Sequence, residues 1–268
     1  MKKIGFVLLL MMIALNVAFA DYPRPWETYF QEPATPVMER FYKFHDKLLV
    51  IITAVSLFVL ALLVYACIRF SKKFNPIPSK TTHNVKLEVL WTIIPVFILL
   101  YISVPSFKTL YYSDVTPESE MTLKVVGHQW YWEYIYPEQE NIAFESYMIK
   151  DEDIKPGQIR LLEVDNQVVL PVDTVVKVLI TSADVLHSWA IPAFGIKTDA
   201  VPGRTNETWM KITKPGVYYG QCSQLCGFGH GFMPIAIKAV SKEDFKQWLE
   251  DAKKKYSYNQ NSLLSSIN

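Results

Sequence analysis

Two long apolar runs in the first half of the chain form the strongest pattern in its sequence. Residues 48–70 carry no charged side chain before Arg69, and residues 89–112 are uncharged except near their far end. A helix of about 20 residues covers the roughly 30 Å of a bilayer's hydrocarbon core. Pro95 and Pro105 lie inside the second run, which membrane helices tolerate when neighbouring groups satisfy the freed backbone. The pattern predicts a transmembrane hairpin.

The first 20 residues have the pattern of a secretory signal peptide. Lys2 and Lys3 precede an apolar run, and Ala18-Phe19-Ala20 matches an A-x-A cleavage site. A short first transmembrane helix is the alternative, but the run is short and Asp21 follows at once. We therefore expect cleavage of residues 1–20, which places the mature N-terminus outside the cytoplasm.

The loop between the two spans is basic, with Arg69, Lys72, Lys73, Lys80 and Lys86. The positive-inside rule assigns such a loop to the cytoplasm. Residues 21–112 then form an N-terminal segment and the hairpin, and everything from about residue 113 lies outside.

Beyond the hairpin the pattern changes to short β-rich pieces separated by Pro/Gly turns. The pattern predicts strands at residues 121–126, 142–149, 159–164, 175–180, 207–212, 216–220 and 234–240. Many short strands of this kind favour a sandwich or a barrel. A capping-box-like start at Ser241 predicts a terminal helix over residues 242–255, and the polar tail 256–268 is expected to be disordered.

The candidate chemistry concentrates in one short segment between two of the predicted strands. Cys222 and Cys226 are four residues apart, His230 follows four residues later, and Met233 three residues after that. A lone His187 on an upstream loop supplies a second imidazole. Thiolate, imidazole and thioether are the soft and borderline donors that copper selects over hard oxygen ligands. Two cysteines on one loop can bridge two ions, whereas a mononuclear blue-copper site needs only one.

A disulfide and a zinc site are two other interpretations of this segment. The chain has three cysteines, too few for a disulfide framework, but Cys222 and Cys226 could still form one disulfide. Zinc is the competing metal, although a methionine ligand argues against it, since structural zinc sites use Cys and His. The third cysteine, Cys67, lies in an apolar run and is expected to be buried and inert.

The order His187 … Cys222-x-x-x-Cys226-x-x-x-His230-x-x-Met233 resembles the binuclear copper A site of cytochrome c oxidase subunit 2. The likeness extends to residues 91–95, 127–132, 161–166, 184–189 and 197–204, and it covers about residues 36–248. The resemblance implies a membrane-anchored all-β fold, in which a two-helix transmembrane hairpin is followed by a cupredoxin-like β-sandwich over residues 113–255.

The resemblance also implies a ligand set for two copper ions. The thiolates of Cys222 and Cys226 would bridge the ions, and the other ligands would be His187, His230, Met233 and the backbone carbonyl of Gln224. The family usually has glutamate in place of Gln224, and that carboxylate binds magnesium at the interface with subunit 1. Glutamine offers only a neutral oxygen, and magnesium prefers carboxylate and water oxygens. The resemblance therefore implies that the Gln224 carbonyl is a copper ligand, but it does not establish the Gln224 side chain as a magnesium ligand.

By the same resemblance, the protein would accept electrons from cytochrome c at Trp130 and pass them to haem in subunit 1. Oxygen would be reduced to water there with proton pumping, and subunit 3 is a further expected partner. No nucleic-acid partner is expected. Glu88 matches the family acid at the mouth of a proton channel in subunit 1, although a simple interfacial carboxylate is the alternative. The expected location is a bacterial plasma membrane with the copper domain in the periplasm, or a mitochondrial inner membrane with that domain in the intermembrane space.

Charge favours a basic partner for the external domain. Residues 114–213 hold 16 Asp and Glu against eight Lys and Arg, a net charge of −8, although the whole chain is at +1. An acidic face steers a basic protein such as cytochrome c and mainly raises the association rate. The candidate docking acids are Glu138, Glu145, Asp165 and Asp184.

The alternative function is that of a membrane-tethered copper carrier or thiol redox protein that uses Cys222 and Cys226 as a redox pair. A thioredoxin-like carrier would need a βαβ pattern, which the sequence lacks. A quinol-oxidase subunit 2 would share the hairpin and the sandwich but would lack the two cysteines.

Overall fold

The computed structural model describes residues 19–265, with side chains described over residues 21–256. The chain divides into two compact units, one formed by residues 39–114 and the other by the segments before and after them. Of the expected signal peptide, all but its last two residues lies outside the described part of the chain.

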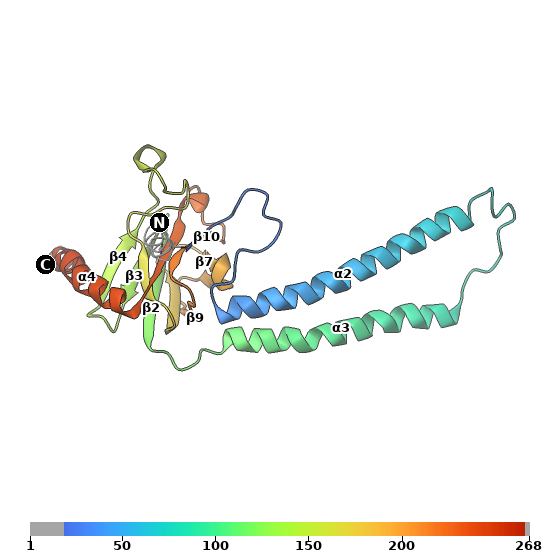
Figure 1. Cartoon of the computed structure of the whole chain (residues 1–268), viewed down its shortest axis with the longest axis horizontal. Coiled ribbons are helices and arrows are strands. Elements are labelled where there is room, and N and C mark those ends of the chain that lie inside the picture. Colours follow the sequence, from blue (N-terminus) through green and yellow to red (C-terminus); the bar gives the residue numbers. More distant parts are fainter. Residues whose placement is uncertain (1–18, 266–268) are drawn as a thin grey trace, which may run out of the picture. The chain divides into compact units, whose positions relative to one another are not determined.

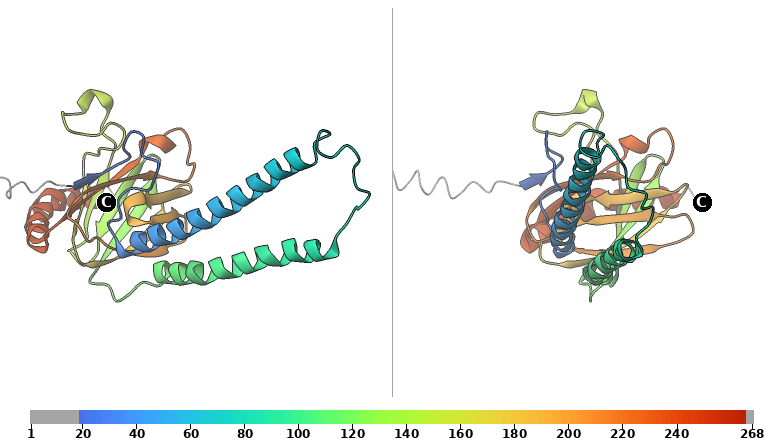
Figure 2. Two further views of the ribbon diagram at one scale, coloured as in Figure 1. Left: turned by 45° about the vertical axis from the view of Figure 1, so that its right-hand side comes forward. Right: turned by 90° about the vertical axis from the view of Figure 1, so that its right-hand side faces the viewer.

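The predicted transmembrane hairpin is confirmed by two long helices, α2 (Pro36–Arg69) and α3 (Val85–Asp114). They run alongside each other and are joined by the basic loop (Figure 2). Each helix is longer than its predicted span because capping residues start it before the apolar run. The Thr35 hydroxyl accepts the backbone N–H of Met38 at 3.1 Å, and the Asn84 side chain accepts those of Lys86 and Leu87 at 3.1 and 3.3 Å.

The other unit is a β-sandwich of two sheets, as predicted (Figure 1). The first sheet has the order β5-β11-β10-β7-β8, with β1 beside β10, and the second has the order β4-β3-β2-β6-β9. The first comprises β1 (Phe19–Asp21), β5 (Val168–Pro171), β7 (His187–Ile191), β8 (Ile196–Ala200), β10 (Gly216–Cys222) and β11 (Pro234–Val240). The second comprises β2 (Met121–His128), β3 (Tyr131–Tyr136), β4 (Ile142–Ser146), β6 (Val175–Ser182) and β9 (Asn206–Lys211). Short 3-10 turns η1 (Asp151–Asp153), η2 (Pro192–Phe194) and η3 (His230–Phe232) lie in the connections.

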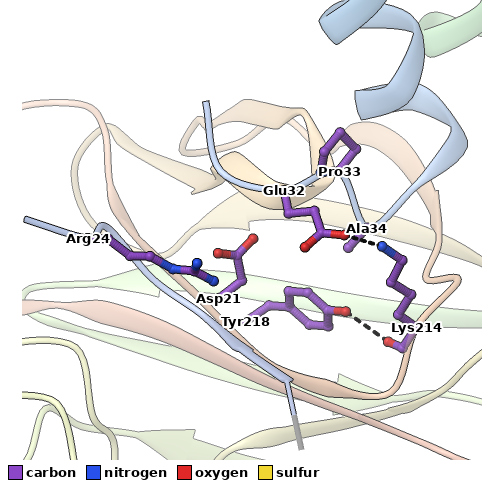
Figure 3. A pocket seen from close by; sticks show the side chains of 7 residues that line it. All are labelled: Asp21, Arg24, Glu32, Pro33, Ala34, Lys214 and Tyr218. Atoms are coloured by element: carbon purple, nitrogen blue, oxygen red, sulfur yellow. Dashed lines mark hydrogen bonds and ion pairs between the residues drawn. The ribbon is translucent and has the colours of Figure 1, made fainter. Parts of the chain in front are cut away.

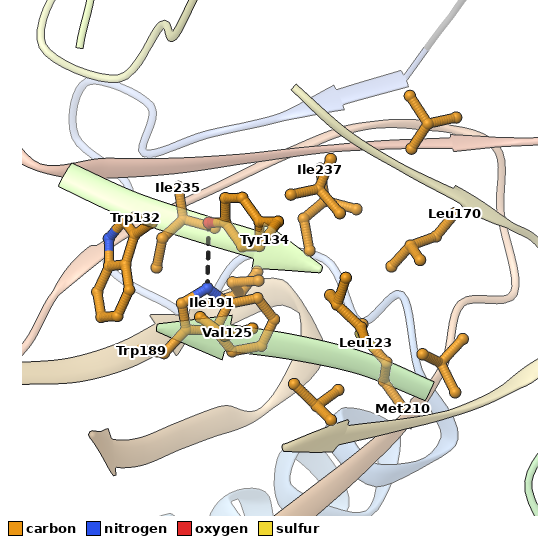
Figure 4. Packing of buried hydrophobic residues seen from close by; sticks show 14 of the residues in the cluster. Leu123, Val125, Trp132, Tyr134, Leu170, Trp189, Ile191, Met210, Ile235 and Ile237 are labelled. Carbon is orange, nitrogen blue, oxygen red and sulfur yellow. Dashed lines mark hydrogen bonds between the residues drawn. The ribbon is translucent and has the colours of Figure 1, made fainter. Parts of the chain in front are cut away.

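Aromatic and branched side chains fill the space between the sheets (Figure 4). Trp132 and Tyr134 from β3 and Trp189 from β7 are fully buried, and the Trp189 indole N–H donates to the Tyr134 hydroxyl at 3.3 Å. Each such ring contributes roughly 1.5–3 kcal/mol through burial of apolar surface. A hydrogen bond between two buried polar groups also removes the cost of leaving either one unpaired. This core therefore holds β7, which starts at His187, rigidly against β3.

The predicted strand at residues 159–164 is wrong. The backbone there turns: the N–H groups of Leu162 and Glu163 both donate to the Ile159 carbonyl, and Leu161 has a φ of 68°. The Glu163 side chain is buried, and its carboxyl oxygens accept hydrogen bonds from Gln167 and Tyr219 at 2.7 and 3.0 Å. The segment therefore forms a turn, which places the Glu163 carboxyl group beside buried hydrogen-bond donors.

Five of the described strands were not predicted, namely β1, β3, β5, β7 and β8. The sequence of β3 is aromatic or apolar at five of its six positions, although its burial alternates, and β7 is buried at every position. Neither segment therefore shows an alternation of apolar and polar residues in the sequence. His187 accordingly starts a strand instead of lying on a loop. The terminal helix α4 (Lys242–Ser265) continues past the predicted end at residue 255, so the tail is helical as far as Ser265 and not disordered.

Cys67 is exposed on the surface of α2, so the expectation of burial within this chain is wrong. Beside β1, a small cavity is lined by Asp21, Arg24, Glu32, Pro33, Ala34, Lys214 and Tyr218 (Figure 3). Lys214 forms a salt bridge with Glu32, and the Tyr218 hydroxyl donates to the Lys214 carbonyl at 2.9 Å. The salt bridge ties the segment before α2 to Lys214, near the opposite end of β10 from Cys222.

Candidate metal centre

The loop between β10 and β11 brings the predicted donors together. Cys222 ends β10, and its backbone N–H donates to the Met233 carbonyl at 3.4 Å, which closes the loop at its base. The N–H of Ser223 donates to the Ser188 carbonyl at 2.9 Å and ties the loop to β7. Because Cys222 pairs with Trp189 across these two strands, the His187 side chain meets the loop.

The donor atoms gather around the two sulfurs. The Nδ1 atom of His187 lies 4.0 Å from the Cys222 Sγ, and the Gln224 carbonyl oxygen lies 3.3 Å from it. The Nδ1 atom of His230 and the Sδ atom of Met233 each lie 3.6 Å from the Cys226 Sγ. Ligand atoms of His187, Cys222 and Cys226 all lie within 4.8 Å of one another.

The two thiols are free, and their sulfurs are 3.9 Å apart. A disulfide needs about 2.05 Å, so the arrangement is not that of a bonded pair. Metal–thiolate bonds of about 2.3 Å allow two sulfurs on one ion to stand up to roughly 4.6 Å apart. Two sulfurs, two imidazoles, a thioether and a carbonyl oxygen therefore fit a soft metal ion, and no carboxylate is needed in the set.

Asp184 orients the buried His187. The Asp184 Oδ1 atom lies 2.9 Å from the Nε2 atom of His187, whose exposed fraction is 0%. A carboxylate on one ring nitrogen fixes the tautomer and directs the other nitrogen, here Nδ1, toward a metal. Sequence reasoning proposed Asp184 only as a docking acid. Its position three residues before a predicted metal-ligating histidine is the signal that could have identified this role.

The protonation states of the two thiols differ. Burial by itself raises the pKa of Cys222, but hydrogen bonds from His187 and the Ser188 backbone outweigh it, so the pKa is lowered. Burial raises the pKa of Cys226, and the neighbouring Cys222 thiolate raises it further. The metal-free site thus favours one thiolate and one thiol, and an ion that binds both sulfurs must release a proton.

Gln224 contributes its backbone and not its side chain. Its carbonyl faces the Cys222 sulfur, while its carboxamide is exposed and has no hydrogen-bond partner among the described residues. The side chain therefore does not take part in the donor cluster.

Trp130 lies against the same loop, half-buried. Its indole N–H donates to the Cys226 carbonyl at 3.2 Å, and its ring meets Phe228 edge-on with centroids 6.3 Å apart. Phe228 is 92% exposed, and Leu225 is 76% exposed. An aromatic and aliphatic rim thus reaches from the donor cluster to the surface.

Three of the four predicted docking acids gather near this rim. Glu145 accepts the Tyr147 hydroxyl at 2.7 Å and Asp165 accepts the Tyr147 backbone N–H at 2.8 Å. The Tyr147 ring stacks on Tyr131, the neighbour of Trp130, at 4.5 Å. Burial raises the pKa of Tyr131, and the charges of Glu145 and Asp184 add to this effect. Glu138 lies apart from them, beyond the far end of β3, where it accepts the Thr122 N–H at 3.0 Å.

Glu88 lies in the first turn of α3. Its Oε1 atom accepts the backbone N–H of Asn84 at 3.3 Å, so the carboxylate closes the N-terminus of the helix. It belongs to the hairpin unit, whereas the predicted metal ligands belong to the other unit.

A membrane hairpin followed by a cupredoxin-like sandwich with a soft-donor loop defines a class of membrane-anchored proteins with an extramembrane metal centre. Two family models match the chain, "Cytochrome C oxidase subunit II, periplasmic domain" at residues 121–240 and "Cytochrome C oxidase subunit II, transmembrane domain" at residues 23–109. The chain belongs to the cytochrome c oxidase subunit 2 family.

Individual relatives agree with this assignment. A probable cytochrome c oxidase subunit 2 of Rickettsia bellii is 54% identical over 94% of this chain and 93% of its own length. Cytochrome c oxidase subunit 2 of Oenothera berteroana is 48% identical over 88% of this chain and 94% of its own. The crystal structure of the periplasmic domain of subunit II of the cytochrome oxidase of Bradyrhizobium japonicum is 51% identical, with a TM-score of 0.50, over 53% of this chain and 99% of that domain.

Proposed function

We propose that this chain is the electron-accepting subunit of a terminal cytochrome c oxidase. The observation that carries the proposal is the convergence of two thiols, two imidazoles, a thioether and a backbone carbonyl around sulfurs 3.9 Å apart. When bound, two copper ions in this site would take one electron at a time from cytochrome c for delivery to haem in subunit 1, where oxygen is reduced to water with proton pumping.

The protein's own residues would supply geometry and electrostatics for that transfer. Cys222 and Cys226 would hold the ions through their thiolates, His187 and His230 would each offer Nδ1, and Met233 and the Gln224 carbonyl would complete the set. Asp184 would hold the His187 ring in place. We assign no magnesium ion to Gln224, because its carboxamide is neutral and lies outside the cluster. Because the β-sandwich lacks the βαβ unit of a thioredoxin-like carrier, the thiol-redox alternative is less well supported.

Cytochrome c would dock over Trp130, where Glu145, Asp165 and Asp184 lie near the aromatic rim. Glu145 and Asp165 have no cation within salt-bridge distance among the described residues, so their charge is available to a basic partner. The docking face would point away from the cytoplasm, into the periplasm or the intermembrane space. Subunits 1 and 3 would surround the hairpin within the membrane.

Reduction of the assembled oxidase by reduced cytochrome c, followed by stopped flow, tests this proposal. We expect the second-order rate constant to fall steeply as ionic strength rises, since exposed charges act over about one Debye length. Glu145→Lys should lower it further at low salt, while Asp251→Lys, a matched reversal on α4, should not. A second-order rate constant that changes neither with ionic strength nor with Glu145→Lys would contradict the docking assignment.

Glu88 would lie at the mouth of a proton channel in subunit 1. Glu88→Gln keeps an oxygen for the Asn84 N–H and removes only the charge, so the helix start should persist while proton uptake slows. Oxygen consumption and proton uptake of the assembled oxidase measure the effect. Turnover and pumping equal to those of the wild type would exclude a proton-uptake role and leave Glu88 as a helix cap.

A further inference from the structure

The indole of Trp130 is seated directly on the backbone of the metal loop. Its N–H donates to the carbonyl of Cys226, a predicted bridging ligand. The carboxamide of Gln129 donates to the same carbonyl at 2.9 Å, and the backbone N–H of Gln129 donates to Asp184 at 2.7 Å. The segment that carries Trp130 is thus tied to both sides of the metal centre, to Cys226 on one side and through Asp184 to His187 on the other.

Gly229 provides the surface on which the indole rests. A Cβ atom built on Gly229 would lie 2.4 Å from Cγ and 2.5 Å from Cδ2 of Trp130, and 2.8 Å from its Cβ. These are the base of the ring and the backbone-proximal end of the side chain, which cannot move aside as a flexible tip can. Any side chain at position 229 would therefore have to push Trp130 off the loop.

The backbone conformation does not by itself demand glycine here. Gly229 has φ −89° and ψ 13°, values that alanine also adopts. The requirement for glycine is thus steric, and it comes from Trp130. Gly227 differs, because its φ of 112° strains any other residue whatever the neighbouring space.

We propose that Gly229 is a positioning residue for electron transfer, which fixes the distance and orientation of Trp130 relative to the metal loop. The inference rests on the proposed function insofar as Trp130 receives the electron. Gly229 has no side chain that could bind metal. It acts only by leaving room for the Trp130 indole to pack on the loop backbone. The N–H···O=C bond from Trp130 to Cys226 would then provide a short, fixed connection between the exposed rim and a bridging ligand.

A matched pair of substitutions in the same loop tests the proposal. Gly229→Ala meets Trp130, whereas a Cβ atom on Gly231 meets no described heavy atom within 4 Å, and its φ lies outside the left-handed range. In the assembled oxidase, we expect Gly229→Ala to keep its copper content and its EPR spectrum but to lose roughly tenfold or more in the rate of electron uptake at saturating cytochrome c. Gly231→Ala should stay within about twofold of the wild type, since it displaces nothing.

A double-mutant cycle separates positioning from a general disturbance of the loop. If Gly229 acts through the indole, Gly229→Ala should add no further loss in a Trp130→Ala background, because the clash is gone. That double variant also relieves the overlap, so it stays informative even if Gly229→Ala alone folds poorly. Equal losses in Gly229→Ala and Gly231→Ala, or a full additional loss in the double variant, would overturn the proposal.

A second measurement does not depend on the proposed function. In the full-length chain with ¹⁵N-labelled tryptophan, the Trp130 indole N–H should be protected from exchange by its bond to the Cys226 carbonyl, and Gly229→Ala should abolish that protection. If the chain failed to accept electrons from cytochrome c while this loss of protection was still seen, the proposed function would be contradicted. The positioning of the Trp130 indole by Gly229 would still be supported. An indole signal unchanged by Gly229→Ala would show that Gly229 does not position the Trp130 indole.

Discussion

A Cys222→Ser chain is expected to bind no copper after purification, whereas a Cys67→Ser chain should retain the wild-type content. Cys222 is the sulfur nearest His187 and the Gln224 carbonyl, so its loss removes the bridge between the two halves of the donor cluster. A serine hydroxyl stays protonated at neutral pH and is a harder donor, and it cannot replace a thiolate for copper. Cys67 lies on α2, in the other compact unit of the chain, and serves as the matched control.

Copper measured per chain by elemental analysis decides this prediction. Cys226→Ser should give the same result as Cys222→Ser, because both sulfurs are needed to bridge two ions. Full copper binding by either single variant would mean that the site is mononuclear or lies elsewhere.

Trp130→Ala is expected to slow electron uptake from cytochrome c by roughly 100-fold while leaving the copper content unchanged. The indole bridges the exposed rim and the Cys226 carbonyl, so its removal takes away the contact with the partner and the connection to the loop in one step. None of the six donor atoms belongs to Trp130, so the cluster should persist.

Stopped-flow reduction of the assembled oxidase measures the effect, and Trp26→Phe is a suitable control, because Trp26 is 97% exposed and distant in sequence from the metal loop. A Trp130→Ala oxidase that takes up electrons at the wild-type rate would show that electrons reach the loop by another route, for example through Phe228.

The sequence predicted the parts of this molecule whose signals are local. The hairpin follows from two uninterrupted apolar runs, and the cysteine loop follows from four donors within one short segment between two strands. What the sequence did not reveal depends on contacts between distant residues. β7 is buried on every side, so it lacks alternation, and His187 was placed on a loop. The turn at residues 159–163 depends on burying Glu163 against Tyr219, some fifty residues away.

The role of the glycines is another case in which tertiary contacts decide. Gly229 and Gly231 are equivalent in the sequence, each flanked by an aromatic residue and His230. Only the structure shows that Trp130, about a hundred residues upstream, lies over one of them and leaves the other free. In the same way, the sequence does not distinguish Asp184 from the other candidate docking acids. Its role follows from the contact of its carboxylate with Nε2 of His187.

In the proposed function, the loop from Cys222 to Met233, together with His187, holds two copper ions that share one unpaired electron. Metal analysis and EPR of the full-length, copper-loaded chain test it most directly. We expect two coppers per chain and a hyperfine pattern from one unpaired electron spread equally over two copper nuclei. A single copper with the pattern of one nucleus, or zinc in place of copper, would contradict it.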